Sequence, residues 1–348
     1  MLADRLEARS ASLPREAMTE AGAGAVRPDV SVVIPTRNRL PWLMRTLASV
    51  RRQQGLAVEV VVVDDGSTDG TADAVAQLED PHIRLVRNPR SLGLAGARNA
   101  GIRATVGEWI AFLDDDDLWS PLKLKVQVRA ASASAALWCY SAAATVDVQG
   151  RILHIADPPE PGSLTARLRG WNVIPAGASN VVVRADLLQF VGHFDEQFRH
   201  FADWDLWIRL AAAAPPATVP EVLVAYVEHP GNLRFTEPDV LVRELQIFDA
   251  KHRLAGDSER ERFAILRWIA DAEWRSGRHA AAAMTFGRLL RSGSALSQAR
   301  WALASLRAGL RRDDRVRDIG QRREHLPWLD QQLSTARIGG VSTIPRTP

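Results

Sequence analysis

Carboxylates follow two apolar segments of this sequence, and their clustering is the first sign of chemistry. Asp64 and Asp65 follow the apolar run 58–63, and the run 109–113 leads directly into four aspartates at 114–117. Adjacent carboxylates repel one another, at about 1 kcal/mol for each pair 4 Å apart even in water. A divalent cation or a ligand rich in hydrogen-bond donors would relieve this repulsion. The run 114–117 is either a binding segment or a solvated acidic turn, and the buried strand expected in front of it favours a binding segment.

Strands and helices that alternate from residue 29 onward must position these carboxylates. Such alternation predicts right-handed parallel crossovers and a doubly wound α/β sheet. The ends of three strands, at 35–37, 64–65 and 114–117, should then lie along one edge, where open α/β sheets bind ligands. The expected strands are 30–34, 58–63, 83–86 and 109–113, and the expected helices are 40–54, 71–78 and 93–105.

Composition excludes several classes of protein. The chain is 46% hydrophobic and 24% charged with a net charge of +3, which is typical of a soluble globular protein, and it has no Lys/Arg block that would indicate nucleic-acid binding. The single Cys139 rules out a disulfide within the chain. No apolar run reaches the roughly 18 residues that span a bilayer, and the charged N-terminus lacks the apolar stretch of a signal peptide. We expect a cytoplasmic protein.

Three other nucleotide-binding or metal-binding motifs are not present in this sequence. Counted from Asp65, the twelfth position of a calcium loop is Ala76, where that loop needs a bidentate Glu. The chain has no Walker A sequence, and no G-x-G-x-x-G follows a strand. The chain therefore lacks the glycine-rich loops with which P-loop NTPases and nicotinamide enzymes normally bind phosphate.

Four segments in order resemble the successive signatures of family 2 glycosyltransferases. They are 30–39, 61–70, 93–101 and 112–117, and the resemblance covers roughly residues 29–230. It implies the GT-A (nucleotide-diphospho-sugar transferase) fold, with a mostly parallel doubly wound sheet. It also implies an inverting transfer of a sugar from a nucleotide diphosphate donor, for which we expect a UDP-sugar, to a hydroxyl acceptor.

The resemblance implies a set of donor-binding residues. Asp65 would accept hydrogen bonds from the base or ribose, with an Asx-type turn as the alternative role. Arg98 would approach the donor phosphates, with a plain surface position as its alternative. Gly93 would allow the backbone to approach the nucleotide closely. Thr36 and Arg37 would form the first donor loop.

The resemblance also implies a metal site in the D-x-D segment. Asp116 would ligate the metal directly, Asp114 would contact the ribose or a metal-bound water, and Asp115 could do either. Mn²⁺ or Mg²⁺ is expected, because both take oxygen ligands, and either would stabilise the charge on a diphosphate leaving group. His229 would complete the metal site or touch the diphosphate. The family's arginine near this histidine is displaced here, and Arg234 is a candidate substitute.

The segment 201–210 resembles the family's acidic helix start, with Ala202 at the first acidic position as a departure. Asp203 then occupies the position of the catalytic base that accepts the proton of the acceptor hydroxyl. The alternative is that Asp203 is only a helix N-cap. Asp205 would lie in the first turn of the helix, where the dipole favours a carboxylate.

We divide the chain into a disordered leader (1–28), a catalytic domain (29–236), a helical region (237–311) and a mostly irregular tail (312–348). The nucleotide-binding half of the catalytic domain is 29–117, and the acceptor half is 118–236, with a loop-rich segment at 143–178. The C-terminal helices could cap the catalytic domain, form a homodimer or touch the inner face of a membrane.

Two other functions remain open. One is a sugar nucleotidyltransferase, although such enzymes carry a Gly-rich, Lys-containing signature near the first strand, where Thr36 and Arg37 stand here. The other is a non-catalytic binding protein with a degenerate transferase domain, which an intact D-x-D and Asp203 disfavour. The acceptor could be a glycan, a lipid-linked molecule or a small molecule.

Overall fold

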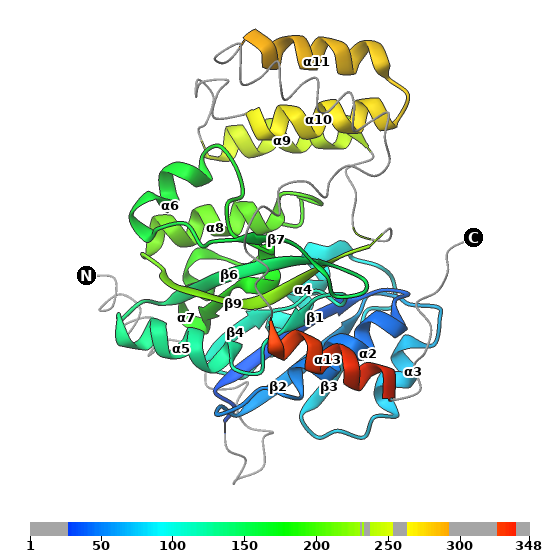
Figure 1. Cartoon of the computed structure of the whole chain (residues 1–348), viewed down its shortest axis with the longest axis vertical. Coiled ribbons are helices and arrows are strands. Elements are labelled where there is room, and N and C mark those ends of the chain that lie inside the picture. Colours follow the sequence, from blue (N-terminus) through cyan, green and yellow to red (C-terminus); the bar gives the residue numbers. More distant parts are fainter. Residues whose placement is uncertain (1–26, 230–231, 233–236, 253–262, 292–325, 339–348) are drawn as a thin grey trace.

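The computed structural model of the chain describes residues 27–229, 232, 237–252, 263–291 and 326–338. These residues form one sheet of nine strands in the order β3-β2-β1-β4-β8-β6-β9-β5, and β7 pairs with β6 (Figure 1). Helices cover both faces of the sheet. The fold is the predicted α/β type.

The first half of the sheet is parallel, as predicted. Each strand is joined to the next in sequence by a helix, and β1 lies between β2 and β4. All seven residues of β1 are buried, because helices pack on both of its faces. The strands are β1 (Val30–Thr36), β2 (Val58–Asp64), β3 (Ile83–Arg87) and β4 (Trp109–Phe112), and the helices are α2 (Leu40–Val50), α3 (Thr71–Ala76) and α4 (Gly93–Ala104).

Helix α4 packs unusually close to the sheet. A Cβ added to Gly101 would lie 2.4 Å from Cγ1 of Val33 and 3.0 Å from Cγ2 of Val63. Only glycine allows this approach. The glycines and alanines of this segment thus set the distance between α4 and the strands whose ends carry the polar residues.

The second half of the sheet is mixed. Strand β8 is antiparallel to both β4 and β6, whereas β9 is parallel to β6 and β5 is antiparallel to β9. The prediction of a mostly parallel sheet therefore describes the first half only. These strands are β5 (Leu118–Trp119), β6 (Trp138–Asp147), β7 (Ile152–Ala156), β8 (Val182–Arg184) and β9 (Ala217–Glu228).

The segment 143–178 is more regular than we expected. Strand β6 continues to Asp147, and β7 follows it after a turn. The run of small apolar residues at 142–144 is buried and pairs with β9 on one side, which extends the strand past the point where the sequence pattern weakened. The helices of this half are α5 (Lys123–Ala133), α6 (Pro161–Leu168), α7 (Ala185–Val191) and α8 (Ala202–Ala213), with a 3₁₀ helix, η2, at Gly177–Asn180.

Among the described residues, four more helices follow the sheet. Helices α9, α10 and α11 lie together at one end of the molecule, and α13 lies apart from them near α2 (Figure 1). The end of the predicted helical region, 292–311, and the leader up to residue 26 lie outside the described residues. Within the tail, which we expected to be mostly irregular, residues 327–338 are helical. These helices are α9 (Pro238–His252), α10 (Phe263–Arg275), α11 (His279–Arg291) and α13 (Pro327–Ile338).

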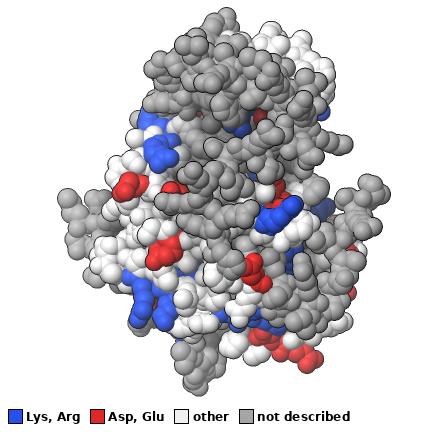
Figure 2. Space-filling model, in the orientation of Figure 1, with Lys and Arg blue, Asp and Glu red and all other residues white. Residues whose placement is uncertain are grey.

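Helix α13 returns to the sheet because it carries an apolar side. Leu329 is buried in a cluster with Leu118 of β5 and Val227 of β9, and the Gln332 side chain donates to the backbone carbonyl of Trp119 at 2.6 Å. Among the described residues, no helix is both long and apolar enough to cross a membrane. On the face seen in Figure 2, the described basic and acidic side chains are interspersed, in line with the small net charge.

Candidate active site

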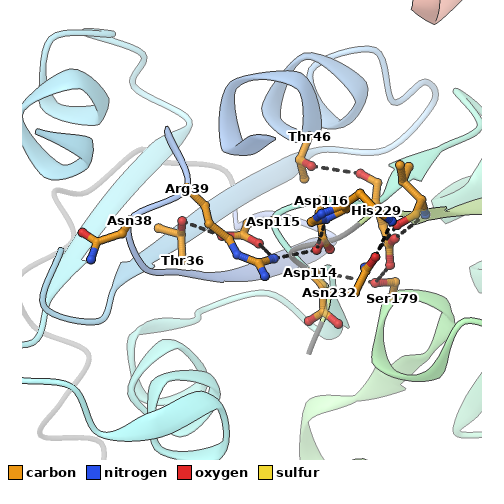
Figure 3. Close-up of polar contacts among 12 residues, drawn as sticks. Thr36, Asn38, Arg39, Thr46, Asp114, Asp115, Asp116, Ser179, His229 and Asn232 are labelled. Atoms are coloured by element: carbon orange, nitrogen blue, oxygen red, sulfur yellow. Dashed lines mark hydrogen bonds and ion pairs between the residues drawn. The ribbon is translucent and has the colours of Figure 1, made fainter. Parts of the chain in front are cut away.

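Strand ends from β1, β2 and β4 meet at one edge of the sheet. Thr36, the last residue of β1, is the register partner of Asp64, the last residue of β2. The backbone N–H of Asp65 donates to the Thr36 carbonyl at 2.9 Å. The Thr36 hydroxyl donates to Oδ2 of Asp115 at 2.7 Å, just beyond β4 (Figure 3). Side chains 79 residues apart are thus joined across the strand ends.

The Arg39 guanidinium faces two of the clustered aspartates. Its Nη1 lies 2.6 Å from Oδ2 of Asp116 and 3.3 Å from Oδ1 of Asp115 (Figure 3). Burial of Asp115 and the charge of Asp116 raise the pKa of the Asp115 carboxyl to about 7, although Arg39 opposes the rise. The sequence analysis missed Arg39. One feature of the sequence could have indicated it: Arg39 is a basic residue three positions after the end of a strand, and that strand end was expected to lie beside the aspartate run.

His229 reaches the same aspartate from the end of β9. Its Nε2 lies 3.0 Å from Oδ2 of Asp116, and its ring stacks on Trp42 of α2 with centroids 4.1 Å apart. The backbone N–H of His229 donates to the Asn232 side chain. The two predicted metal ligands therefore converge, and the proposed substitute Arg234 lies outside the described residues.

Arg98 pairs with Asp114 inside the protein. Its Nη2 lies 2.5 Å from Oδ1 of Asp114, and its guanidinium lies over the Phe194 ring, 5.2 Å from the centroid. The residue is 3% exposed, so the alternative of a plain surface arginine is wrong. Contact between Arg98 and donor phosphates stays a prediction, because every contact seen here is within the protein.

The Asp65 carboxylate holds the loop that leads into α4. Four donors point at its two oxygens, which is about the number of lone-pair sites that a carboxylate offers. A nucleoside that bonded to Asp65, as predicted, would have to replace one of these donors. They are Asn88 Nδ2 at 2.8 Å, Ser91 Oγ at 2.6 Å, the Leu92 N–H at 2.9 Å and the Gly93 N–H at 3.1 Å.

The other predicted donor-loop residues lie nearby on the surface. Gly93 has φ +77°, and a Cβ built on it would meet nothing within 4 Å, so open space lies beside its backbone. Arg37 is exposed directly after β1. Asn38, with φ +53°, accepts the Thr68 N–H at 2.7 Å and so joins the loops after β1 and β2. The contact between Asn38 and Thr68 thus fixes the two loops to each other beside the strand ends.

Asp203 lies in the first turn of α8. Its Oδ2 accepts a hydrogen bond from Asn172 at 3.0 Å, and its Oδ1 accepts the Trp204 N–H at 2.7 Å. The helix begins at Ala202 with Phe201 as the N-cap residue, so the alternative that Asp203 is the N-cap is wrong. Gly177 lies so close that an added Cβ would be 2.9 Å from Oδ2 of Asp203. The sequence pattern pointed to neither Asn172 nor Gly177.

Burial raises the pKa of Asp203, and the negative charge of Asp114 raises it further. The positive charge of Arg98 and the hydrogen bonds from Trp204 and Asn172 oppose this effect. A carboxylate with a raised pKa is a stronger base than a solvated one. Asp203 thus lies within reach of the electrostatic field of the Arg98–Asp114 pair.

Asp117, the last aspartate of the run, is a fully buried structural residue. Its Oδ2 accepts the Ser179 hydroxyl at 2.5 Å, its Oδ1 accepts the Val227 N–H at 3.0 Å, and its carbonyl accepts the Thr46 hydroxyl at 2.9 Å. Ser179 also accepts the N–H of Asp114 at 3.1 Å. This network, which the sequence did not reveal, fixes the aspartate run against α2, η2 and β9.

The described residues include no group of three or more His, Cys, Asp or Glu side chains arranged to hold a metal. Asp116 and His229 nevertheless bring a carboxylate oxygen and an imidazole nitrogen together, and both are ligands that Mn²⁺ accepts. Magnesium is commonly held by one or two carboxylates together with substrate phosphates. Asp116 and His229 therefore fit a divalent ion whose remaining ligands would come from a bound diphosphate.

Comparison with known sequences gives one family match. Residues 31–192 match the model of glycosyl transferase family 2. The chain is 38% identical over 159 residues to the succinoglycan biosynthesis protein ExoO of Rhizobium meliloti, which covers 46% of this chain and 44% of ExoO. It is 37% identical over 99 residues to the Escherichia coli UDP-Glc:alpha-D-GlcNAc-diphosphoundecaprenol beta-1,3-glucosyltransferase WfgD, covering 28% and 39% of the two chains. The matches thus span less than half of either relative.

Solved structures share the fold at low sequence identity. The mannosyltransferase PcManGT of Pyrobaculum calidifontis, in complex with GDP-Man and Mn²⁺, superposes with a TM-score of 0.51 at 22% identity and covers 97% of both chains. Residues 1–349 of S. aureus TarS give a TM-score of 0.52 at 17% identity, covering 76% of this chain and 80% of TarS. These likenesses concern the fold alone.

Proposed function

We propose that this chain, which belongs to glycosyltransferase family 2 and has the GT-A fold, transfers a sugar from a nucleotide-diphosphate donor to a hydroxyl acceptor. One observation carries the proposal. The aspartates after β4 are linked to Thr36 and His229 on one side, and through Arg98 to the surroundings of Asp203 on the other. These contacts support a single site that contains both a metal-binding group and a proton-accepting group.

The donor is held at the strand ends in this proposal. Thr36, Arg37 and Gly93 would contact the donor, and Asp114 and Asp115 would lie beside it. Asp116 and His229 would hold Mn²⁺ or Mg²⁺, which supplies charge stabilisation for the departing diphosphate. The Mn²⁺ and GDP-Man bound to PcManGT support a metal-bound nucleotide sugar as donor. We favour a UDP-sugar, in line with the UDP-GlcNAc complex of TarS and the activity in the name of WfgD.

Asp203 is the general base of the proposed reaction. The acceptor oxygen attacks the anomeric carbon of the donor and passes its proton to the Asp203 carboxylate. The bond from that carbon to the diphosphate oxygen breaks, and the nucleoside diphosphate leaves with the electron pair. Attack from the side opposite the leaving group inverts the anomeric configuration. The Asn172 hydrogen bond to Oδ2 orients the carboxylate for this role.

The acceptor is proposed to be a sugar hydroxyl on a lipid-linked or free glycan. The diphosphoundecaprenol in the name of WfgD supports the lipid-linked class.

The D203N variant tests the proposal. A panel of nucleotide sugars is first screened by thermal shift with and without Mn²⁺, and release of nucleoside diphosphate is then followed with candidate acceptors. We expect D203N to keep the donor-induced shift and to lose about 10²–10⁴ in transfer rate, which is typical for loss of a general base. The control D73N changes an exposed carboxylate of α3 and should leave both readouts unchanged. Transfer by D203N at the wild-type rate would refute the assignment.

The same panel separates the alternatives. A nucleotidyltransferase would form a nucleotide sugar from a nucleoside triphosphate and a sugar phosphate, and a binding module would show the thermal shift with no turnover in wild type or variant. Either outcome would contradict the proposed transfer.

A further inference from the structure

Glu244 of α9 lies at the start of α8, the helix that carries Asp203. Its Oε1 accepts the backbone N–H of Arg199 at 2.9 Å, and its Oε2 accepts the N–H of His200 at 2.9 Å. The N–H of Phe201 donates to the same Oε2 at 3.3 Å. Three consecutive backbone donors in front of the helix are therefore satisfied by one side chain, 43 to 45 residues away in sequence.

These three donors precede the first turn of α8, and their acceptor comes from a distant segment. Helix α8 has no side-chain N-cap, since Phe201 stands at that position and Ala202 follows it. Glu244 is only 4% exposed, and a buried carboxylate is costly unless it is hydrogen-bonded. A negative charge here also interacts favourably with the positive end of the helix dipole. Burial raises the pKa of Glu244, but the His200 imidazole, whose Nδ1 lies 3.3 Å from Oε1, and the backbone N–H groups of His200 and Arg199 hold it below its usual value.

A second contact fixes the same two helices farther along. The Asp205 carboxylate of α8 is fully buried. Its Oδ1 lies 2.8 Å from Nζ of Lys251 and 2.9 Å from Nε2 of His252, both at the end of α9. Arg209 of α8 completes the cluster at 2.7 Å from Oδ2. Two buried carboxylates, one from each helix, thus flank Asp203 in sequence. Glu244 of α9 bonds to the turn in front of α8, and Asp205 of α8 bonds to the end of α9.

We propose that Glu244 is a positioning residue for Asp203, which it serves by fixing the turn 199–201 and with it the direction of the first turn of α8. Helix α9 is then part of the catalytic unit, and the boundary we drew at residue 237 falls inside that unit. This inference rests on the proposed function, because it assigns Asp203 as the base.

The variants E244Q and E244A test the proposal, with E237Q as the matched control. Glu237 also bonds to Arg199, but through an exposed side-chain ion pair at 2.7 Å with both partners about half exposed. We expect kcat to fall on the order of 10–100-fold in E244A, as small misplacements of a reacting group can cause. E244Q, which keeps the shape and one acceptor oxygen, should lie between E244A and wild type. KM for the donor and the nucleotide-induced thermal shift should stay unchanged.

A double variant distinguishes positioning from general destabilisation. If Glu244 acts only through Asp203, then adding E244A to D203N should cause no further loss of transfer, because the two residues form one functional unit. An additional loss of the same size as in the wild-type background would overturn the proposal. So would wild-type kcat in E244A and E244Q. If D203N itself retained full transfer, the proposed function would fail instead. That result differs from the one that would overturn only the role of Glu244, in which D203N is inactive and E244A has the wild-type kcat.

Discussion

His229 Nε2 lies 3.0 Å from Asp116 Oδ2, although 113 residues separate the two in sequence. The approach is fixed from both sides. Asp117, next to Asp116, accepts the backbone N–H of Val227 at 3.0 Å, which locks the end of β9 to the aspartate run. Trp42 then stacks on the His229 ring and fixes its orientation. The histidine is thus held before any ligand binds, as a preorganised metal or diphosphate contact would be.

The first prediction concerns this histidine and the metal. We expect H229N to weaken Mn²⁺ binding in the presence of nucleoside diphosphate by at least about 10-fold, the lower end of the loss seen when even an outer partner of a metal site is removed. Titration followed by electron paramagnetic resonance measures free Mn²⁺ directly. H154N, at an exposed position on β7, is the control. Equal Mn²⁺ affinity in H229N and H154N would remove His229 from the metal site.

The second prediction concerns the pH dependence of the Asp203 base. Because burial raises its pKa, the acid limb of kcat/KM should lie above the value of about 3.9 for a free aspartate. The Arg98 charge lowers this pKa, so R98M should move the limb to still higher pH, whatever it does to the maximum rate. A pH–rate profile of kcat/KM reports the pKa of the free enzyme.

The R151M variant controls for the loss of an arginine paired with an aspartate, since Arg151 is exposed and bonds to Asp147 at 2.6 Å on the surface. Its profile should superpose on that of wild type. A limb that moved to lower pH in R98M would contradict the electrostatic link between Arg98 and Asp203.

The strands that carry the site were predictable because their signals are local. The mostly apolar runs at 30–34 and 109–113 are buried throughout, the run 58–63 is buried from Val60 onward, and each ends at polar residues. Parallel connection through helices then places those ends along one edge. The positions of Thr36 and the aspartate run follow from that rule alone, without knowledge of any side-chain contact.

The residues that the sequence analysis missed depend on contacts between distant segments. Asn172 and Gly177 matter because their loop lies against α8, and nothing in the segment 169–178 indicates that neighbour. No local sequence pattern distinguishes Glu244, yet it is buried against a turn 43 residues earlier. Periodicity reports which side of a helix is buried, but it does not identify the partner of a polar side chain on that helix.

The third prediction concerns Gly177, whose backbone has φ +50°. An alanine there would be strained by about 1–2 kcal/mol in this left-handed conformation, and its Cβ would lie 2.9 Å from Oδ2 of Asp203. We expect G177A to lower both the melting temperature and kcat, because the base must move to make room. Donor binding should persist, since Asp203 takes no part in it.

Gly162 provides the matched glycine. It lies in α6, and an added Cβ there meets nothing within 4 Å. G162A should keep wild-type kcat and gain a little stability, since alanine is the better helix former by about 1 kcal/mol. If G177A kept wild-type kcat, close packing of Gly177 against the Asp203 carboxylate would have no part in catalysis.

The last prediction concerns acid stability and the buried cluster around Asp205. Burial alone would raise the pKa of Asp205, but the hydrogen bond from His252 and the charges of Arg209 and Lys251 lower it to about 2. A pKa below the ordinary value of 3.8 means that the ionised form stabilises the fold. This stabilisation, about 2 kcal/mol, is fully present above pH 4 and is lost as the pH falls through 2.

D205N removes this stabilisation and leaves three basic groups without their buried partner. We expect the free energy of unfolding to fall by about 3–5 kcal/mol near neutral pH. The difference in urea midpoint between wild type and D205N should therefore shrink between pH 4 and pH 2, while D186N, which breaks a partly exposed pair with Arg184, should change the midpoint little at any pH. Because Asp205 joins α8 to α9, hydrogen exchange should also quicken in both helices of D205N at pH 7. A midpoint difference that stayed constant down to pH 2 would show that Asp205 does not stabilise the fold through its charge.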